Sequence, residues 1–474
     1  MTATAPMPTG SNIRGDLAKI VGFLVCVEIA SGVLQGYYTP IFTDIARHLA
    51  IHDADVNWFE ASQLMVSAIL VPVLAKAGDL YGHKKVLVFA TIATAAATWA
   101  VAFAPTFATF LVAWSLQGFY VVWLPLEVAI VHRRTSGDER RTRWAAGVLV
   151  AALEASVIVA ALTSGALADT MGMTTLLLLP AVVVTLAIVV IWFGVPDVPP
   201  VETGRLDWLG FGLLAAGLGA IMAGLMVLRL TGVANLWPWA LLALGVALFV
   251  PFTRVELASP APLVDLRVFF APGQWPVQLT ATLFGASVLG AQIPLSTFAR
   301  TDPNVAGYGL GVSASGVSII IGLYVLSLAV GALTMPLIAR RIGTLWSLAL
   351  GAGLVTVGYL LFLPFHGTYL QTLTNMVIAG IGSGSLVAAL PAAAAAAAPS
   401  THTGFVTGMT NTVKTIGGSV ASAIYGLALL STGSLDTAAG HAPLSGYLVV
   451  WTICGATALV AAVILARLAS RRRP

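Results

Sequence analysis

The chain has 474 residues, of which 58% are hydrophobic and only 9% carry a charged side chain. Soluble domains carry roughly 25% charged residues, so the composition excludes a water-soluble enzyme of this size and predicts an all-α membrane protein. The net charge of +4 comes from basic residues scattered in short loops, which argues against nucleic-acid binding. Cys26 and Cys454 both lie in apolar runs, so neither a disulfide framework nor a metal site is expected.

Fourteen apolar runs follow one another along the chain. The segment before the first run is polar, and that run is too long for a signal peptide. A run of about 20 apolar residues crosses a bilayer as a helix. The expected transmembrane helices are 17–40, 57–76, 85–104, 107–131, 144–167, 172–194, 208–230, 236–252, 275–299, 314–338, 344–364, 369–395, 404–430 and 446–467, of which 236–252 is short.

The basic residues predict how these helices are oriented. If the N-terminus is cytoplasmic and the spans alternate, only Arg47, Arg229 and Arg300 fall outside, and Lys414 falls within a span. Every other Lys and Arg is then cytoplasmic, as expected when positive charge is retained on the inner side. The sequence therefore predicts a multi-pass protein of the cell membrane with both termini in the cytoplasm.

Two longer polar connections, 132–143 and 252–274, and a shorter one, 197–207, divide the spans. They predict two six-helix bundles, 1–194 and 275–474, with two extra central helices within 195–274. Gly82, in the loop after the second span, corresponds to Gly343 after the tenth, where two homologous halves would place a shared loop.

The loop AKAGDLYGHKK (75–85) resembles the signature Gly-x-x-x-Asp-Arg-x-Gly-Arg-Arg of the major facilitator superfamily. Asp79, Gly82 and Lys84 match, whereas Leu80 and His83 stand at arginine positions. Further stretches resemble the fourteen-span drug:proton antiporter branch of that family, namely LQGFYVVWLP (116–125), RLDWLGFGLL (205–214), PLVDLRVF (262–269) and TGMTNTVKTIGGSVASA (407–423). The resemblance implies a transporter fold, a small-molecule substrate and no cofactor.

Three departures concern the residues that the family uses for proton coupling. Trp114 stands where the fourth span of the family carries an arginine. The antiporter motif of the fifth span is degraded to ALTSGALAD (161–169), which keeps Gly165 but lacks proline. The first-span motif Asp-x-Thr-Ile-Val-Asn is absent, and Glu28 lies twelve residues before Pro40 instead. The resemblance therefore supports the fold more firmly than the coupling residues.

Ionisable residues within the spans are candidate proton sites, because a charged acid at the bilayer centre costs about 2.5–3.5 kcal/mol on insertion scales. Glu28 and Glu154 lie near the middle of the first and fifth spans, and Glu127 lies toward the inner end of the fourth. Apolar neighbours of Glu154 disfavour the charged form of its carboxyl group. We expect Glu28 and Glu154 to carry protons, with Glu127 as a third site or a gate. An ion pair between Glu127 and Lys414 is the structural alternative.

Two polar or aromatic stripes predict the substrate site. Glu28, Ser31, Gln35 and Tyr38 are spaced for one helical face of the first span. In the fourth span Trp114 and Gln117 share one face, whereas Tyr120, Trp123 and Glu127 share another, giving an aromatic wall beside a carboxylate. Burial against another helix, or ordinary packing, remains the alternative for each stripe. Lys414 completes the predicted substrate site, and Glu60, at the outer start of the second span, is expected to be interfacial.

The signature loop is expected to act in gating. In the family this loop latches the two halves on the cytoplasmic side, which the resemblance implies for Asp79, Gly82 and Lys84. An acid near a helix N-terminus is also favoured by the helix dipole.

These features together predict a proton-coupled antiporter that exports small hydrophobic or amphipathic compounds, including cationic ones, by alternating access and as a monomer. A specific uptake or metabolite transporter on the same fold is the alternative, favoured by Trp114 and the degraded fifth-span motif. The sequence has no Gly-x-x-x-x-Gly-Lys-Ser/Thr loop, and its seven histidines lack metal-ligand spacing, so neither ATP drive nor an enzyme is expected.

Overall fold

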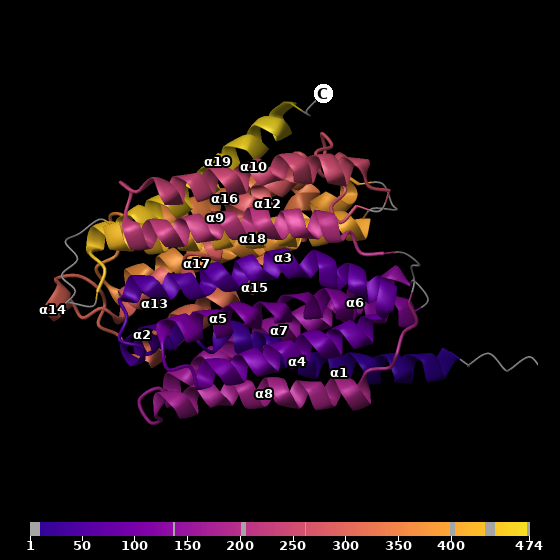
Figure 1. Cartoon of the computed structure of the whole chain (residues 1–474), viewed down its shortest axis with the longest axis horizontal. Helices are drawn as coiled ribbons and strands as arrows, with labels where there is room; N and C mark the ends of the chain where they lie inside the picture. The colour runs from indigo at the N-terminus through magenta and orange to yellow at the C-terminus, as the bar shows by residue number, and fades with distance from the viewer. Residues whose placement is uncertain are drawn as a thin grey trace, which may run out of the picture.

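The computed structural model describes residues 10–135, 138–200, 205–260, 262–398, 403–431 and 441–471. Helices that run side by side dominate it (Figure 1). In the described part of the chain, thirteen helices are long and apolar enough to cross a membrane, and α16 (Thr344–Leu360) is a shorter apolar helix. The all-helical membrane fold is therefore confirmed, whereas the fourteenth span stays a prediction that depends on α16.

The N-terminal group of helices runs from α1 to α8. Its elements are α1 (Gly10–Gly36), η1 (Thr39–Ile41), α2 (Phe42–His48), η2 (Asp53–Val56), α3 (Asn57–Tyr81), α4 (His83–Ala102), α5 (Phe107–Gln117), η3 (Gly118–Val122), α6 (Trp123–Arg134), α7 (Glu139–Leu167) and α8 (Met173–Gly194). The predicted fourth span is thus interrupted by the 3₁₀ segment η3. One hydrophobic core joins most of these helices.

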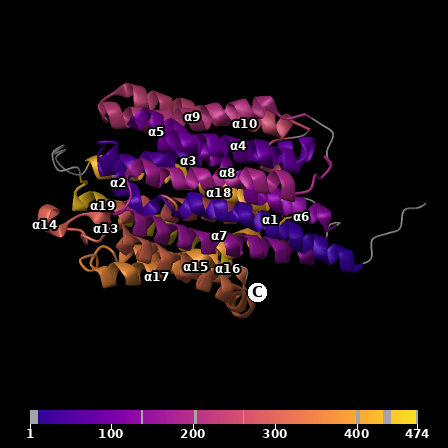
Figure 2. The same cartoon turned by 90° about the horizontal axis from the view of Figure 1, so that it is seen from below.

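A hairpin of two helices follows, α9 (Trp208–Thr231) and α10 (Leu236–Ala258). It lies along one edge of the bundle (Figure 2). Helix α9 packs against α3 and α18. The short predicted span 236–252 is therefore a full helix, α10, whose 23 residues extend into the predicted loop.

The C-terminal group runs from α12 to α19 and has its own core. The short helix α11 (Leu266–Phe269) precedes this group. The elements of the group are α12 (Trp275–Val288), α13 (Gln292–Arg300), α14 (Pro303–Ala306), α15 (Ala314–Ile342), α16, α17 (Tyr369–Ala396), α18 (Thr403–Ser431) and α19 (Leu444–Arg471). The predicted span 275–299 is broken into α12 and α13. The division into two six-helix halves stays a prediction, although the two separate cores support it.

Matching turns support the internal repeat. Gly82 ends α3 with φ 104°, and Gly343 ends α15 with φ 84°. This region of backbone conformation favours glycine. Capping boxes begin α5 and α17, where Thr106 and Thr368 accept the third backbone N–H of each helix. Equivalent local signals therefore lie at equivalent positions of the two groups.

The two groups meet along two helix pairs, α3 with α18 and α7 with α15. Serine hydroxyls of one group donate to backbone carbonyls of the other across both pairs. These bonds run from Ser419 to Ala61 (2.6 Å), Ser422 to Asn57 (3.0 Å), Ser318 to Ala161 (2.7 Å) and Ser315 to Gly165 (2.8 Å). Ser318 also reaches the carbonyl of Ala314 in its own helix, at 2.9 Å.

These serine bonds lie toward one end of the bundle, which we call the α2 end because α2, α13 and α14 lie there (left in Figure 1). The groups are therefore joined at the α2 end. The opposite end holds the first described residues of α1 and the last of α19.

Candidate functional site

Two carboxyl groups meet inside the N-terminal group. Glu28 on α1 and Glu127 on α6 are both fully buried, and their carboxyl groups are near enough to interact electrostatically. Among the described residues, no group donates a hydrogen bond to either carboxyl group. Two charged carboxylates in contact repel each other, and an apolar environment disfavours both. The arrangement is therefore suited to holding a proton.

The interrupted fourth span places these groups. Helix α5 ends at Gln117, η3 covers Gly118–Val122, and α6 starts at Trp123, so the chain is not one regular helix. Pro125 lies in the first turn of α6, where its missing N–H leaves no helical bond unmade. The fourth span was predicted as one continuous helix with two side-chain faces, and the break at η3 means that neither face continues regularly from α5 into α6.

A third carboxyl group and a phenol lie beside this pair. Tyr120, in η3, interacts electrostatically with both Glu28 and Glu60, and its ring meets that of Trp123 edge-on at 6.2 Å between centroids. The sequence predicts that Glu60 is interfacial, which stays a prediction; in the structure Glu60 is half-buried and its carboxyl interacts electrostatically with Tyr120. Glu60, Gln63 and Ser67 are spaced for one face of α3, and this polar spacing was the sequence signal that could have placed Glu60 among the candidate site residues.

The predicted first-span stripe divides into two parts. The amide of Gln35 donates to the hydroxyl of Ser31 at 3.3 Å, one turn from Glu28. Helix α1 ends at Gly36, so the regular spacing does not extend to Tyr38. Ser31 and Gln35 therefore stay with Glu28, whereas Tyr38 lies beyond the end of α1, and a face shared by all four residues stays a prediction.

Tyr38 belongs to a packed cluster instead. Its hydroxyl accepts a bond from the amide of Gln117 at 3.3 Å, and its ring contacts Trp114 edge-on at 4.5 Å. Gln117 also donates to Thr98 at 3.2 Å and accepts from Gln63 at 3.4 Å. All of these side chains are buried, so the arrangement favours packing, and a substrate role for Tyr38, Trp114 and Gln117 stays a prediction.

Glu154 and Lys414 interact electrostatically across the boundary between the two groups. Glu154 is on α7 and Lys414 is on α18, and their opposite charges attract. Tyr324 on α15 also interacts with Glu154. The alternative pairing of Lys414 with Glu127 is not observed, because the carboxyl of Glu127 lies against Glu28. Sequence spacing could not distinguish these pairings, since they join helices far apart in the chain.

The predicted gating residues make contacts within the N-terminal group. Asp79 lies in the last turn of α3, four residues before the first residue of α4, so its stabilisation by a helix dipole stays a prediction. Its carboxylate contacts His83 Nε2 at 3.3 Å, at the start of α4. Lys84 donates to the carbonyl of Trp192 near the end of α8 at 3.0 Å. A gating role for Asp79, Gly82 and Lys84 stays a prediction.

Within the described ranges, no cluster of three or more histidine, cysteine, aspartate or glutamate side chains could hold a metal ion.

Comparison with known proteins places this geometry in a wider context. A family model described as Major Facilitator Superfamily matches residues 24–262 and 275–474. A uridine/deoxyuridine transporter of Lactococcus lactis is 24% identical over 401 residues, covering 80% of this chain and 82% of that protein. A probable actinorhodin transporter of Streptomyces coelicolor is 24% identical over 471 residues, covering 93% and 77%.

The fold is shared with solved transporters. The crystal structure of the nucleoside transporter NupG aligns with a TM-score of 0.63 at 16% identity, covering 97% of this chain and 100% of the other. A peptide transporter of the POT family in complex with sulfate aligns with a TM-score of 0.68 at 17% identity, covering 96% and 94%.

Proposed function

This chain belongs to the major facilitator superfamily, and from that premise we propose that it is a proton-coupled antiporter of the fourteen-span drug:proton branch. It would export small hydrophobic or amphipathic compounds, including cationic ones, by alternating access. The observation that carries this proposal is the burial of two interacting carboxyl groups, those of Glu28 and Glu127, in the N-terminal group.

The carboxyl pair would exchange a proton for substrate. A proton held between Glu28 and Glu127 neutralises one of two groups that cannot both be charged cheaply in an apolar site. A bound cation would favour the doubly ionised pair and so release the proton. Tyr120 and Trp123 beside the pair supply aromatic surface for an amphipathic cation. One proton moving down about 100 mV supplies about 2.3 kcal/mol.

Glu154 and Lys414 would respond to the same cycle at the boundary between the groups. Their attraction acts between α7 of one group and α18 of the other. Neutralising Glu154 weakens that attraction, so a proton arriving there favours separation of the groups. This gives Glu154 a coupling role that differs from direct substrate binding.

The proposed orientation rests on where the basic residues lie. Arg47, Arg229 and Arg300 are at the α2 end. The arginines and lysines in the helix ends where α3 meets α4, α6 meets α7 and α15 meets α16 are at the opposite end. We propose that the α2 end faces outward, with both termini cytoplasmic in the cell membrane, and that the protein acts as a monomer.

Reconstitution in liposomes tests the coupling. A pH gradient should drive accumulation of a lipophilic cation such as ethidium, with matched proton movement reported by an internal dye. Glu28→Gln and Glu127→Gln should each reduce gradient-driven accumulation about tenfold or more. Substrate counterflow, which needs no proton, should stay unchanged in both variants. Asp302→Asn, in an exposed loop, serves as the control. Intact coupled transport in both glutamate variants would refute the proposal.

A specific nucleoside transporter is the second candidate. The uridine/deoxyuridine transporter that this chain resembles favours it, as do Trp114 in the fourth span and the degraded motif at 161–169. Counterflow with radiolabelled uridine, measured in both directions and with ethidium as competitor, separates the two. Saturable uridine exchange that ethidium does not inhibit would favour the nucleoside transporter.

A further inference from the structure

Three aspartates in the segment between α1 and α3 each pair with a different part of the molecule. Asp44 binds Arg300 of α13 at 2.7 Å, and Asp55 binds Arg229 of α9 at 2.6 Å. Asp53 contacts Nδ1 of His441, just before α19, at 2.6 Å. The α2 end is thus held by three ionic contacts, two of which join the N-terminal group to the C-terminal group.

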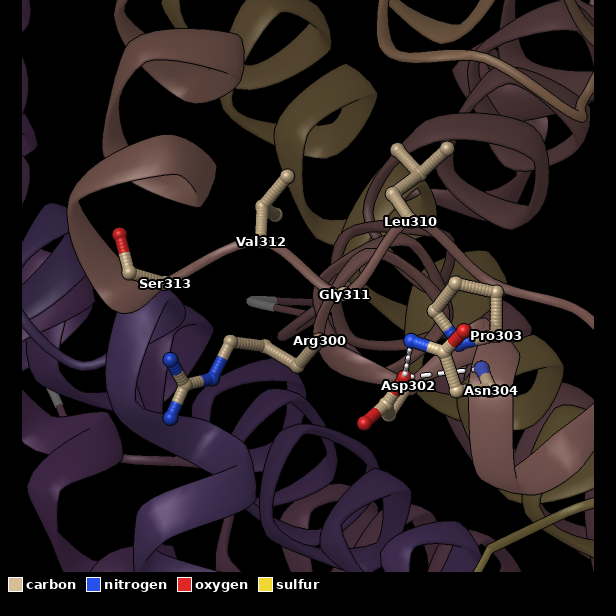
Figure 3. A pocket seen from close by; sticks show the side chains of 8 residues that line it. All are labelled: Arg300, Asp302, Pro303, Asn304, Leu310, Gly311, Val312 and Ser313. Carbon is tan, nitrogen blue, oxygen red and sulfur yellow. Dashed lines mark hydrogen bonds between the residues drawn. The ribbon is translucent and has the colours of Figure 1, made fainter.

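Only one of these three contacts has a cation that titrates near neutral pH. Arginine stays charged throughout the physiological range, whereas histidine changes charge within it. Figure 3 shows the side chain of Arg300 extending away from Asp302, toward the helices of the N-terminal group. Arg300 and Asp302 line a cavity of about 500 Å³. The charges of the two arginine contacts therefore do not change near neutral pH, whereas the charge of the histidine contact does.

His441 is firmly attached to the C-terminal group. The carbonyl of the next residue, Ala442, accepts a hydrogen bond from the hydroxyl of Tyr308. The ring of Tyr308 stacks on Phe298 of α13, with centroids 6.1 Å apart. Ala442 is fully buried. Movement of the C-terminal group therefore carries His441 with it.

Asp53 is attached to the N-terminal group with similar firmness. It begins η2, where the ring of His52 accepts the backbone N–H of Ala54 at 3.1 Å. The amide of Asn57, the first residue of α3, donates to the carbonyl of Ala54 at 2.9 Å. The side chain of Asp53 is only 6% exposed. Separation of the two groups at this end would therefore break the contact between Asp53 and His441.

We propose that His441 and Asp53 form a proton-binding site that closes the α2 end when His441 is protonated and favours its opening when His441 loses its proton. This site is distinct from the carboxyl pair of Glu28 and Glu127. It would make the equilibrium between closed and open α2 ends depend on the pH of the solution at that face, whatever ion drives transport.

The direction of the pH response follows from the charges around the histidine. The hydrogen bond to Asp53 raises the pKa of His441 above 6.5, while partial burial and the positive charge of Arg47 on α2 oppose that rise. Asp55, also on η2, is neutralised by Arg229. Burial raises the pKa of Tyr308 to about 12, so this neighbour stays neutral.

The sign can then be stated. A histidine whose pKa is raised in the closed form stabilises that form fully below its ordinary pKa, and the contribution is lost as the pH rises through the raised value. The closed population should therefore fall with increasing pH, with its midpoint above pH 6.5.

Distance measurements between spin labels test this proposal without any transport assay. Labels at Ala50→Cys and Val305→Cys, both exposed, report the separation of the two groups at the α2 end. The background carries Cys26→Ala and keeps Cys454, which is fully buried. The full-length protein in lipid nanodiscs exposes both faces to the buffer, so the result does not depend on orientation.

The population of long distances should rise at least about twofold between roughly pH 6 and pH 9. His441→Gln should abolish this response and show more open molecules at the lower pH. His441→Arg, whose charge is permanent, should stay closed throughout. His48→Gln, on the exposed surface of α2, should behave like the unmodified protein.

An unchanged pH response in His441→Gln, or a retained response in His441→Arg, would overturn the proposal. Loss of proton coupling in the Glu28 and Glu127 variants leaves these distances unaffected. The two proposals can therefore fail independently.

Discussion

The ion pair between Asp55 and Arg229 offers a measurable test of how the α9–α10 hairpin is held. Nε and one terminal nitrogen of the arginine reach the two carboxylate oxygens at 2.7 and 2.6 Å. The side chains are only 8% and 18% exposed, and the guanidinium also lies over the ring of Phe107 at 5.5 Å. This is a two-point, largely desolvated pair.

Removing one partner should therefore leave a buried charge without compensation. Such losses cost about 3–5 kcal/mol, and we expect about 3 kcal/mol for Arg229→Met because Asp55 lies near an end of the bundle, where water can approach. Arg47→Met removes a pair with Asp44 at the same end, but Arg47 is 71% exposed. Exposed pairs contribute about 0–1 kcal/mol, so this variant is the matched control.

A double-mutant cycle measured by reversible unfolding in mixed micelles separates the pair from its surroundings. We expect Asp55→Asn and Arg229→Met each to destabilise strongly, and the double variant to lose much less than the sum, with a coupling energy of about 2 kcal/mol. Additive losses, or a loss for Arg229→Met no greater than for Arg47→Met, would refute the account of a desolvated pair.

Two further predictions concern glycines. Gly384→Ala should destabilise by about 1–3 kcal/mol because a methyl group there would meet the backbone of Leu328, whereas Gly353→Ala, which has open space, should be nearly neutral in the same unfolding assay. Gly82→Ala and Gly343→Ala should each cost about 1–2 kcal/mol, since both positions have positive φ. Equal neutrality of Gly384→Ala and Gly353→Ala, or no loss at either turn, would contradict these expectations.

The long helices were predictable from the sequence because a long apolar run lowers its free energy by leaving water. It can do so equally well in lipid or in the protein interior. The sequence could not locate the breaks at Gly118–Val122 and between α12 and α13, since a local change of backbone conformation leaves hydropathy unchanged. The fourteenth span stays a prediction, because α16 has only 17 residues.

The candidate site was only partly predictable. An acidic residue within an apolar span is conspicuous because a charged carboxylate there is energetically costly. Glu28, Glu127 and Glu154 could therefore each be recognised from the sequence. Their partners could not, because Glu28 and Glu127 are brought together by tertiary packing between α1 and α6. Asp53 and His441 lie outside the spans, where a polar residue carries no penalty and gives no signal.

The hydroxyl of Ser318 has one acceptor in α7 and another in its own helix. A polar hydrogen exposed to hydrocarbon without an acceptor is costly, and that cost normally discourages helices from parting once they have bonded. Here the hydrogen keeps the Ala314 carbonyl when the Ala161 carbonyl moves away. This hydrogen bond can consequently be broken and remade when α7 and α15 move apart and return, with little energy lost, a property that a fixed structural contact would not require.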